Sequence, residues 1–333
     1  MKVLVTGAAG FIGFHLCKEL IANNHEVVGL DNLNSYYDVE LKQIRLSELQ
    51  LLSTFTFVKM DLINDREISN LVAEGKFDAI YNLAAQAGVR LKKSEYQSYI
   101  NSNIVGFSNI LNSAIEYGVQ NFLYASSSSV YGNGLSGALI ENKSLTLPTS
   151  FYGSTKLFNE NIARTLVKGT KTRSRGLRFF TVYGPYGRPD MAYFRIASSL
   201  LNNSKFTLFG DGTIERDFTF VGDVAVATMQ LCSELSLKPQ GYSDIVNIGG
   251  GKPVAINSLI SKISDKLGAH LSIINEPRNP SDVAVTHADT QTIYNLIKFI
   301  PQISLDEGLD SFLDWARKPS IRQKLQAWTE SAP

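Results

Sequence analysis

Short apolar segments alternate with longer amphipathic segments through the first half of the chain. The apolar segments lie at residues 2–6, 26–30, 55–59, 79–83 and 121–125, and each has the length of a buried strand. Residues 11–22 repeat their apolar side chains at helical spacing, and further helical stretches separate the later strands. This alternation predicts an α/β fold, in which a doubly wound parallel sheet is covered by helices on both faces.

The turn between the first strand and the first helix is rich in glycine. Gly7, Gly10 and Gly13 follow the pattern G-x-x-G-x-x-G. Glycine lets the backbone turn tightly and approach a pyrophosphate, which the free N–H groups at the helix N-terminus then bind. We therefore expect a dinucleotide here, and we include Phe11 and Ile12 among its contacts.

Acidic residues follow the second and third predicted strands. The Asp31 carboxylate can accept hydrogen bonds from both ribose hydroxyls of an adenosine and would repel a 2′-phosphate. This favours NAD over NADP, with Asn32 in the same site. Asp61 and Leu62 follow the third strand, where they can contact the adenine. The alternatives are a turn aspartate at position 31 and a simple helix cap at position 61.

A tyrosine and a lysine four residues apart lie near the start of another predicted helix. Tyr152 and Lys156 then lie on one face of that helix. Because the ammonium favours the phenolate, we expect it to lower a tyrosine pKa that is normally about 10 and to create a proton-transfer pair. Tyr294 and Lys298 have the same spacing, but within what we interpret as an ordinary amphipathic helix.

The composition excludes several classes of function. The 333 residues are 44% hydrophobic and 19% charged, as in ordinary globular proteins, and their number allows two domains. The formal net charge is +1 without a long block of like charge, so we expect no nucleic-acid or membrane partner. Cys17 and Cys232 make no disulfide framework, and neither a signal peptide nor a membrane span is evident. We therefore expect a cytoplasmic protein.

Several motifs occur together and in order along the chain. They are Gly7-x-x-Gly10-x-x-Gly13, Asp31, Asn82-Leu83-Ala84-Ala85, the Ser-Ser-Ser-Ser-Val-Tyr-Gly run at 126–132, and Tyr152-x-x-x-Lys156. Their combination resembles the extended short-chain dehydrogenase/reductase family, the nucleotide-sugar epimerases and dehydratases. The resemblance implies a Rossmann-type domain with bound NAD over residues 1–180. It also implies a smaller C-terminal α/β domain, mainly residues 181–333, that closes over a sugar nucleotide while some segments return to the first domain. Clear strand–helix alternation is lost after Phe180, which indicates the same boundary.

The resemblance also implies catalytic roles. Ser127 falls where family members place a Ser or Thr that hydrogen-bonds the sugar C4 oxygen, while Tyr152 moves the proton and Lys156 binds the nicotinamide ribose. Dehydratases carry an acidic pair at the positions of Ser128 and Ser129, and decarboxylases usually carry a glutamate in this run. Their absence favours an epimerase, and no metal ion is expected. Further expected cofactor contacts are Leu83, Ala84, Ala85 and Asn103, the last of which can instead serve packing.

Two stretches make the chain most similar to the UDP-glucuronate 4-epimerases. They are residues 31–38 together with 85–90, and residues 187–192. In that subfamily Thr181 and Arg188 fall where the uronate carboxylate is bound. Residues 210–212 and 216–218 resemble the nucleotide-binding segment of the wider family, which implies that Arg216 contacts the diphosphate. The remaining expected substrate contacts are Ser128, Arg90, Arg278 and Asp282.

Departures from that subfamily leave alternatives open. Asn82 replaces a histidine, and residues 91–93 replace a Tyr-Ser. The rival substrates are UDP-glucose and UDP-N-acetylglucosamine, and a non-catalytic NAD-sensing module is an alternative of another class. Arg188 can also be interpreted as part of a loop salt bridge, and Arg216 as a surface arginine. The resemblance further implies a homodimer built from helices around residues 103–117 and 152–167.

Overall fold

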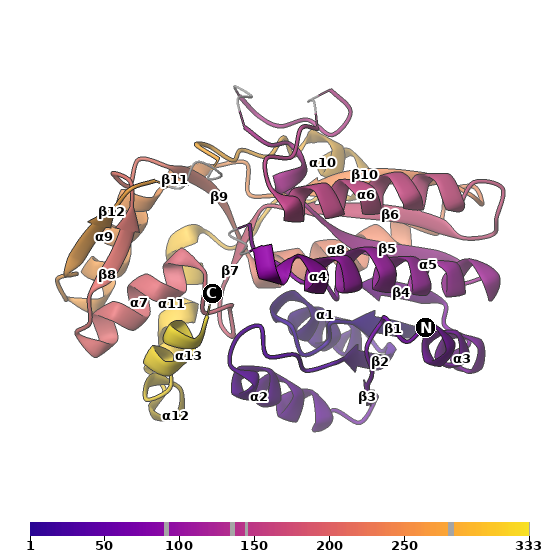
Figure 1. The fold of residues 1–333 in the computed structure, drawn as a ribbon, viewed down its shortest axis with the longest axis horizontal. Helices are drawn as coiled ribbons and strands as arrows, with labels where there is room; N and C mark the ends of the chain where they lie inside the picture. Colours follow the sequence, from indigo (N-terminus) through magenta and orange to yellow (C-terminus); the bar gives the residue numbers. More distant parts are fainter. Residues whose placement is uncertain (90–92, 134–136, 144–145, 279–282, 333) are drawn as a thin grey trace.

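A seven-stranded parallel sheet is the largest unit among the described residues (Figure 1). The computed structural model describes residues 1–89, 93–133, 137–143, 146–278 and 283–332. The strand order is β10-β6-β5-β4-β1-β2-β3, and every neighbouring pair is parallel. The strands are β1 Lys2–Thr6, β2 Glu26–Asp31, β3 Phe55–Lys59, β4 Ala79–Asn82, β5 Asn121–Ser127, β6 Arg173–Phe179 and β10 Ser243–Ile248. Their carboxyl ends therefore meet at one edge of the sheet.

Helices cover both faces of this sheet (Figure 1). Side chains of α1, α8 and α10, among them Phe14 and Leu231, join one core layer with the strands. Side chains of α3, α5 and α6, among them Ile110 and Ala163, join another. These helices are α1 Phe11–Ala22, α3 Asp65–Gly75, α5 Phe107–Glu116, α6 Phe151–Leu166, α8 Val221–Leu235 and α10 Gln291–Ile297. The predicted doubly wound, Rossmann-type fold is confirmed.

A second core lies beside the large sheet, on the left in Figure 1. Its strands form a sheet in the order β11-β9-β7 and a β12-β8 pair. The strands are β7 Thr181–Tyr183, β8 Phe206–Phe209, β9 Glu215–Phe220, β11 Pro253–Ala255 and β12 Ile273–Glu276, and the helices are α7 Ala192–Asn202, α9 Ile256–Leu267, α11 Leu305–Arg317, α12 Pro319–Arg322 and α13 Leu325–Ser331. Tyr193, Phe312 and Trp315 pack at its centre. Helix α2 (Val39–Gln50) also places Leu41 in this core, so α2 connects the two parts of the molecule.

Strands and helices continue beyond Phe180, contrary to the expectation that the alternation is lost there. Helix α8 and strand β10 return to the large sheet, where β10 pairs with β6. The pattern is hard to see in the sequence because β7, β8, β11 and β12 have only three or four residues each. Strand β12 is exposed along its whole length, so it contains no buried apolar run.

Several short helices complete the described chain. They are η1 Lys93–Glu95, α4 Tyr96–Tyr99, the π-helix η2 Ile100–Gly106 and η3 Ser128–Val130.

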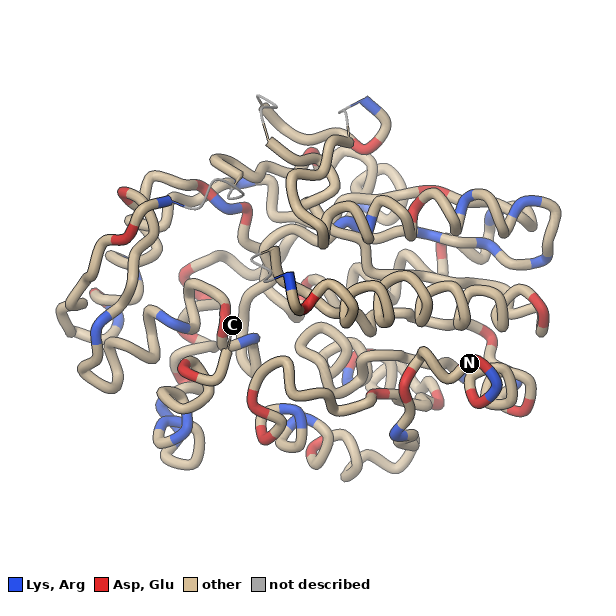
Figure 2. Tube along the Cα trace, in the orientation of Figure 1, with Lys and Arg blue, Asp and Glu red and all other residues tan. Residues whose placement is uncertain are grey.

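Charges of both signs are interspersed along the described chain (Figure 2). The mixed charges agree with the formal net charge of +1. Among the described residues, none of the helices combines the length and the apolar character needed to cross a bilayer.

Candidate active site

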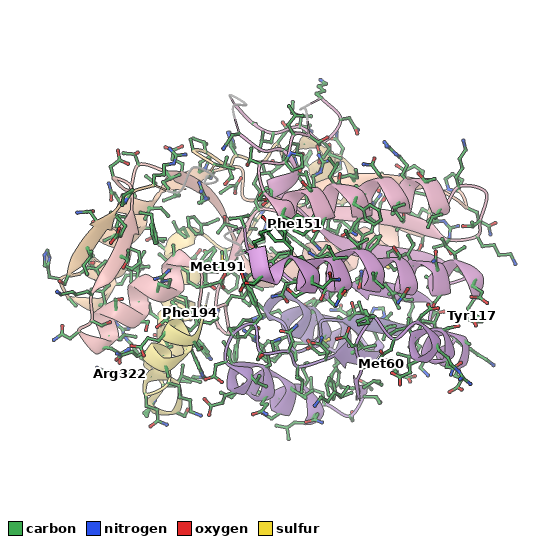
Figure 3. The ribbon with its side chains drawn as sticks, in the orientation of Figure 1. Met60, Tyr117, Phe151, Met191, Phe194 and Arg322 are labelled. Carbon is green, nitrogen blue, oxygen red and sulfur yellow. The ribbon has the colours of Figure 1, made fainter. Side chains whose placement is uncertain are left out.

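The carboxyl edge of the large sheet borders a cavity of about 560 Å³. It lies where the strand order reverses between β1 and β4, the place where doubly wound folds bind ligands. Figure 3 labels Phe151, which directly precedes Tyr152 at the start of α6, and Met191, which lines the cavity before α7; both lie in the middle of the molecule. The predicted site residues that line the cavity are Gly7, Gly10, Phe11, Ile12, Gly13, Asp31, Asn32, Asp61, Leu62, Leu83, Ala84, Ala85, Ser127, Ser128, Tyr152, Lys156, Thr181, Arg188 and Arg216.

The glycine-rich turn leaves no room for a side chain at Gly7, Gly10 or Gly13. Gly7 has a φ of +70°, and a Cβ atom there would lie 2.8 Å from the backbone nitrogen of Ala84. A Cβ atom on Gly13 would lie 2.1 Å from the carbonyl oxygen of Gly7. Helix α1 begins directly after Gly10, which has no side chain to cap it, so its first N–H groups are left for an anion. The turn therefore fits a pyrophosphate.

Asp31 is held rigidly at the end of β2. Its side chain is 7% exposed, and its carboxylate accepts hydrogen bonds from the backbone N–H groups of Ala9 at 3.2 Å and Leu33 at 2.8 Å. The neighbouring Asn32 donates to Asp61 at 2.7 Å, which joins the loops that follow β2 and β3. These groups lie together at the end of the cavity where an adenosine is expected.

Tyr152 lies in the first turn of α6, which the side chain of Ser150 caps. Burial raises the pKa of the Tyr152 phenol above its ordinary value, while the Arg188 guanidinium and a hydrogen bond with Ser127 lower it in part. The expectation that Lys156 lowers this pKa is wrong for this structure, because desolvation outweighs the neighbouring charge and that charge belongs to Arg188. Tyr152 and Ser127, which were both expected to contact the sugar, thus also contact each other.

Lys156 lies one turn further along α6 and is 3% exposed. Its ammonium donates to the carbonyl oxygen of Ala125 at 2.8 Å and lies 5.8 Å from the centre of the Tyr152 ring. Burial lowers the pKa of Lys156 to about 7, and the charge of Glu160 acts in the opposite direction. The strand end and the helix thus fix the position of this ammonium.

All four serines of the run line the cavity, but their side chains have different hydrogen-bond partners. Ser126 donates to Glu160 at 2.5 Å, and Glu160 forms a buried ion pair with Arg178 at 2.7 Å. The hydroxyl of Ser127 caps η3 and also contacts Tyr152. Ser126 therefore anchors α6 to β5, whereas Ser127 is available to a ligand held against Tyr152.

Arg188 reaches the same cavity from the loop after β7. Its Nε and Nη2 atoms donate to the two carboxylate oxygens of Asp190 at 3.0 and 2.5 Å. The guanidinium carbon lies 5.9 Å from the centre of the Tyr36 ring. Arginine has five N–H donors, so further donors remain after this pair. Arg188 thus forms the loop salt bridge that was the alternative interpretation, and it also lines the cavity with Tyr152.

Two more predicted substrate contacts lie on strands of the second core. Thr181 begins β7 and Arg216 lies on β9, and both line the cavity. Nη1 of Arg216 donates to the carbonyl oxygen of Glu215 at 2.9 Å. Arg216 thus contributes to the wall of the cavity as well as to the surface.

Asn103 supports the site from behind its wall. Its side-chain oxygen accepts from the backbone N–H of Gln86 at 2.8 Å, and its amide nitrogen donates to Thr155 at 3.0 Å. It does not line the cavity and ties the loop after β4 to α6. The structure therefore favours the packing role that the sequence left open.

Among the described residues, one more predicted substrate contact lies outside the cavity. Arg278 lies beside Gly210 and does not line the cavity. Arg90 and Asp282 fall outside the described residues. Tyr294 is 40% exposed on α10, away from the cavity, as expected for an ordinary amphipathic helix.

Some lining residues were not predicted from the sequence. Lys42 of α2 donates to the carbonyl oxygen of Asn34 at 2.8 Å, and burial lowers its pKa to about 8 while the charge of Asp31 raises it. Asp190 and Arg195 also line the cavity. Asp190 could have been predicted from its position two residues after Arg188. Lys42 and Arg195 lie within helices, where no local sequence motif indicates that they line a cavity.

Proteins that are similar to this chain include several UDP-sugar 4-epimerases. A UDP-glucuronate 4-epimerase of Thermodesulfobacterium geofontis is 37% identical over 316 residues, which cover 95% of this chain and 96% of that protein. The crystal structure of UDP-glucuronic acid 4-epimerase from Bacillus cereus, in complex with UDP-glucuronic acid and NAD, matches with a TM-score of 0.88 and 36% identity over 97% of this chain and 99% of that one. A UDP-glucose 4-epimerase from Thermotoga maritima, solved with UDP-glucose, matches with a TM-score of 0.85 and 26% identity over 95% and 99%.

The family comparison agrees with the fold and with the motifs around the cavity. A single family match covers residues 3–249, which are most of the chain. This chain belongs to the NAD dependent epimerase/dehydratase family.

Proposed function

We propose that this protein is an NAD-dependent UDP-sugar 4-epimerase that interconverts UDP-glucuronate and UDP-galacturonate. The observation that carries the proposal is the meeting of Tyr152, Ser127 and Arg188 in one cavity with a dinucleotide-binding turn. This grouping joins a proton carrier and a carboxylate-binding cation at the place where the cofactor is expected.

The residues present fit NAD. The glycine turn and the start of α1 would hold its pyrophosphate, Asp31 the adenosine ribose, and Lys156 the nicotinamide ribose. Bound NAD supplies a hydride acceptor that also returns the hydride, so it is regenerated in each cycle. The carboxylate of Asp31 disfavours a 2′-phosphate, which supports NAD rather than NADP.

Tyr152 removes the proton from the C4 hydroxyl of the sugar and later returns it. Because burial raises the pKa of the phenol, a base at this position depends on the charge of Arg188 and on the hydrogen bond with Ser127 to favour its ionised form. Ser127 orients the C4 oxygen toward Tyr152. The sugar then rotates as a 4-keto intermediate before it is reduced from the opposite face.

Arg188 supports the choice of a uronate as substrate. A 4-keto hexuronate is a β-keto acid, which loses carbon dioxide when its carboxylate aligns the breaking C–C bond with the ketone π system. Charge-assisted hydrogen bonds from Arg188, assisted by Thr181 and Ser128, would hold the carboxylate away from that alignment. The Bacillus cereus relative binds UDP-glucuronic acid and NAD, which agrees with this assignment.

The rival substrate is UDP-glucose, which a Thermotoga maritima relative of lower identity binds. A proton NMR time course of the purified protein with both UDP-sugars distinguishes the two. The proposal expects UDP-glucuronate to be converted to UDP-galacturonate and UDP-glucose to react poorly. Equal rates on the two sugars would assign the protein to the rival epimerases.

The proposal includes a homodimer and a cytoplasmic location. Val105 on η2 and Leu166 at the end of α6 are large apolar side chains that are 40% and 38% exposed, on the two helical segments expected to pair. Cys17 and Cys232 are both free and buried, which fits a reducing compartment. Analytical ultracentrifugation tests the dimer, which a monomeric sedimentation coefficient at micromolar concentration would exclude.

A further inference from the structure

The loop that carries Arg188 is fastened to the cofactor-binding half by side chains. We call residues 184–187 the strap, because they connect β7 to Arg188. The carbonyl oxygen of Pro185 accepts from Nε2 of His15 at 2.9 Å. Burial lowers the pKa of His15 to about 4, so at neutral pH this imidazole is uncharged and can donate from one nitrogen.

Arg45 of α2 holds the next two carbonyl oxygens of the strap. Its Nε and Nη2 atoms donate to the carbonyl oxygen of Tyr186 at 3.0 and 2.7 Å, and Nη2 also donates to that of Gly187 at 3.2 Å. Tyr186 has a φ of 58°, in the left-handed region that a non-glycine residue seldom adopts. Its hydroxyl donates to Glu48, one turn after Arg45 on α2. These contacts keep an unfavourable backbone conformation in place.

The same guanidinium also contacts the cofactor turn. Nη1 of Arg45 donates to the carbonyl oxygen of Ala9, between Gly7 and Gly10, at 2.9 Å, and to the hydroxyl of Tyr37 at 2.6 Å. The Arg45 side chain is completely buried and is not among the residues that line the cavity. It therefore lies away from both expected ligands and acts through the segments that it joins, which are the strap, the cofactor turn and the loop of Tyr37.

We propose that Arg45 is a positioning residue for the uronate reaction: it fixes the strap against the cofactor turn and thereby fixes Arg188 relative to the nicotinamide end of the cavity. This inference rests on the proposed function, because it concerns how the substrate carboxylate is held. The planar guanidinium donates in several directions at once, which the compact ammonium of lysine cannot reproduce from the same position.

A displaced strap has a defined chemical consequence. Once C4 is oxidised and the cofactor reduced, a carboxylate that is free to rotate can align its C5–C6 bond with the ketone. That bond then breaks, its electron pair passes into the C4 ketone to give an enolate, and carbon dioxide leaves. A proton from water adds at C5, which yields a UDP-4-keto-pentose and leaves the cofactor reduced. The ratio of this product to the epimer therefore reports the position of Arg188.

The test compares Arg45→Lys with Arg175→Lys in the full-length protein with bound NAD. Arg175 is equally buried but lies away from the cavity, on β6, where it pairs with Glu234 and Asp244. NMR measures the amounts of epimer and of 4-keto pentose formed from UDP-glucuronate. The amount of NAD released when each purified variant is denatured measures how much cofactor the variant retained. We expect Arg45→Lys to retain NAD, to lose roughly 10- to 100-fold in epimerisation, and to shift the product ratio toward the 4-keto pentose. Arg175→Lys should leave the ratio unchanged.

Two outcomes overturn the inference: an unchanged product ratio in Arg45→Lys, or an equal shift in Arg175→Lys. If Arg45→Lys does not fold, Tyr37→Phe removes one acceptor of the guanidinium, and the inference then requires a smaller shift in the same direction. Wild-type protein that does not epimerise UDP-glucuronate would instead contradict the proposed function. The two failures are thus distinguishable.

Discussion

Replacing Arg188 with alanine removes the cation that we place on the substrate carboxylate. Hydrogen bonds between charged groups each contribute about 1.5–3 kcal/mol. Two such bonds to the carboxylate correspond to roughly 3–6 kcal/mol, and each 1.36 kcal/mol is a factor of ten. We therefore expect kcat/KM for UDP-glucuronate to fall by about 10²–10⁴-fold, with much of the remaining turnover ending in the decarboxylated 4-keto pentose.

The same substitution leaves Asp190 without its partner, and this effect must be separated from catalysis. The Asp190 side chain is 14% exposed, so an unpaired carboxylate there should cost about 1–3 kcal/mol of folding free energy. The double variant Arg188→Ala, Asp190→Asn removes that charge and should recover most of the stability. It should not recover epimerisation, because the cation is still absent.

The assay is NMR quantification of epimer and 4-keto pentose, with urea unfolding of each variant as the stability measurement. UDP-glucose has no carboxylate, so in either variant its slow turnover should fall only through the loss of the Arg188 charge beside Tyr152, and by a smaller factor than the turnover of UDP-glucuronate. The reasoning is refuted if Arg188→Ala keeps wild-type turnover of UDP-glucuronate, or if the double variant recovers both stability and epimerisation.

Three further predictions follow from the site. Tyr152→Phe keeps the ring but removes the ionisable group, so NAD should still bind while turnover falls by roughly 10²–10⁴-fold in the NMR assay. Tyr294→Phe is the control and should change turnover little. Near-normal turnover of Tyr152→Phe would contradict the proposed role of Tyr152. Denatured protein should release NAD, identified by chromatography, and mainly NADP would contradict the role of Asp31. Burial lowers the pKa of His15 from 6.5 to about 4, so between these pH values the unfolded chain binds a proton that the folded chain does not. The uncharged His15 therefore contributes folding free energy that is present above pH 6.5 and is lost as the pH falls toward 4. His15→Gln keeps an N–H donor but cannot be protonated. In urea unfolding at pH 7 and 4.5, this variant should lose less free energy of unfolding on acidification than the wild type, by at most about 3 kcal/mol. The same pH dependence in both proteins would contradict this prediction.

The parts that the sequence predicted are those with local signatures. Buried parallel strands are continuous apolar runs, so β1 agrees with the expected residues. Strand β3 also has the expected bounds, although it lies at the edge of the sheet and none of its residues is fully buried. The glycine turn could be interpreted because only glycine tolerates the contacts made at Gly7 and Gly13. Tyr152 and Lys156 could be paired because one helical turn separates them.

The parts that escaped prediction depend on residues brought together by the fold. Arg45 and Tyr186 are 141 residues apart in sequence, and the hydrogen bonds between them have no local signature. The direction of the Tyr152 pKa depends on how deeply α6 is buried and on Arg188, which comes from another loop. Short exposed strands such as β12 gain their partners from tertiary context rather than from an apolar pattern.

The most direct test of the account uses UDP-glucuronate that carries deuterium at C4. In the proposed reaction the hydride removed from C4 returns to the same carbon from the opposite face while the cofactor stays bound. Proton NMR in ordinary water should therefore show UDP-galacturonate that retains deuterium at C4, without added NAD. UDP-galacturonate with protium at C4, or no UDP-galacturonate at all, would contradict the account.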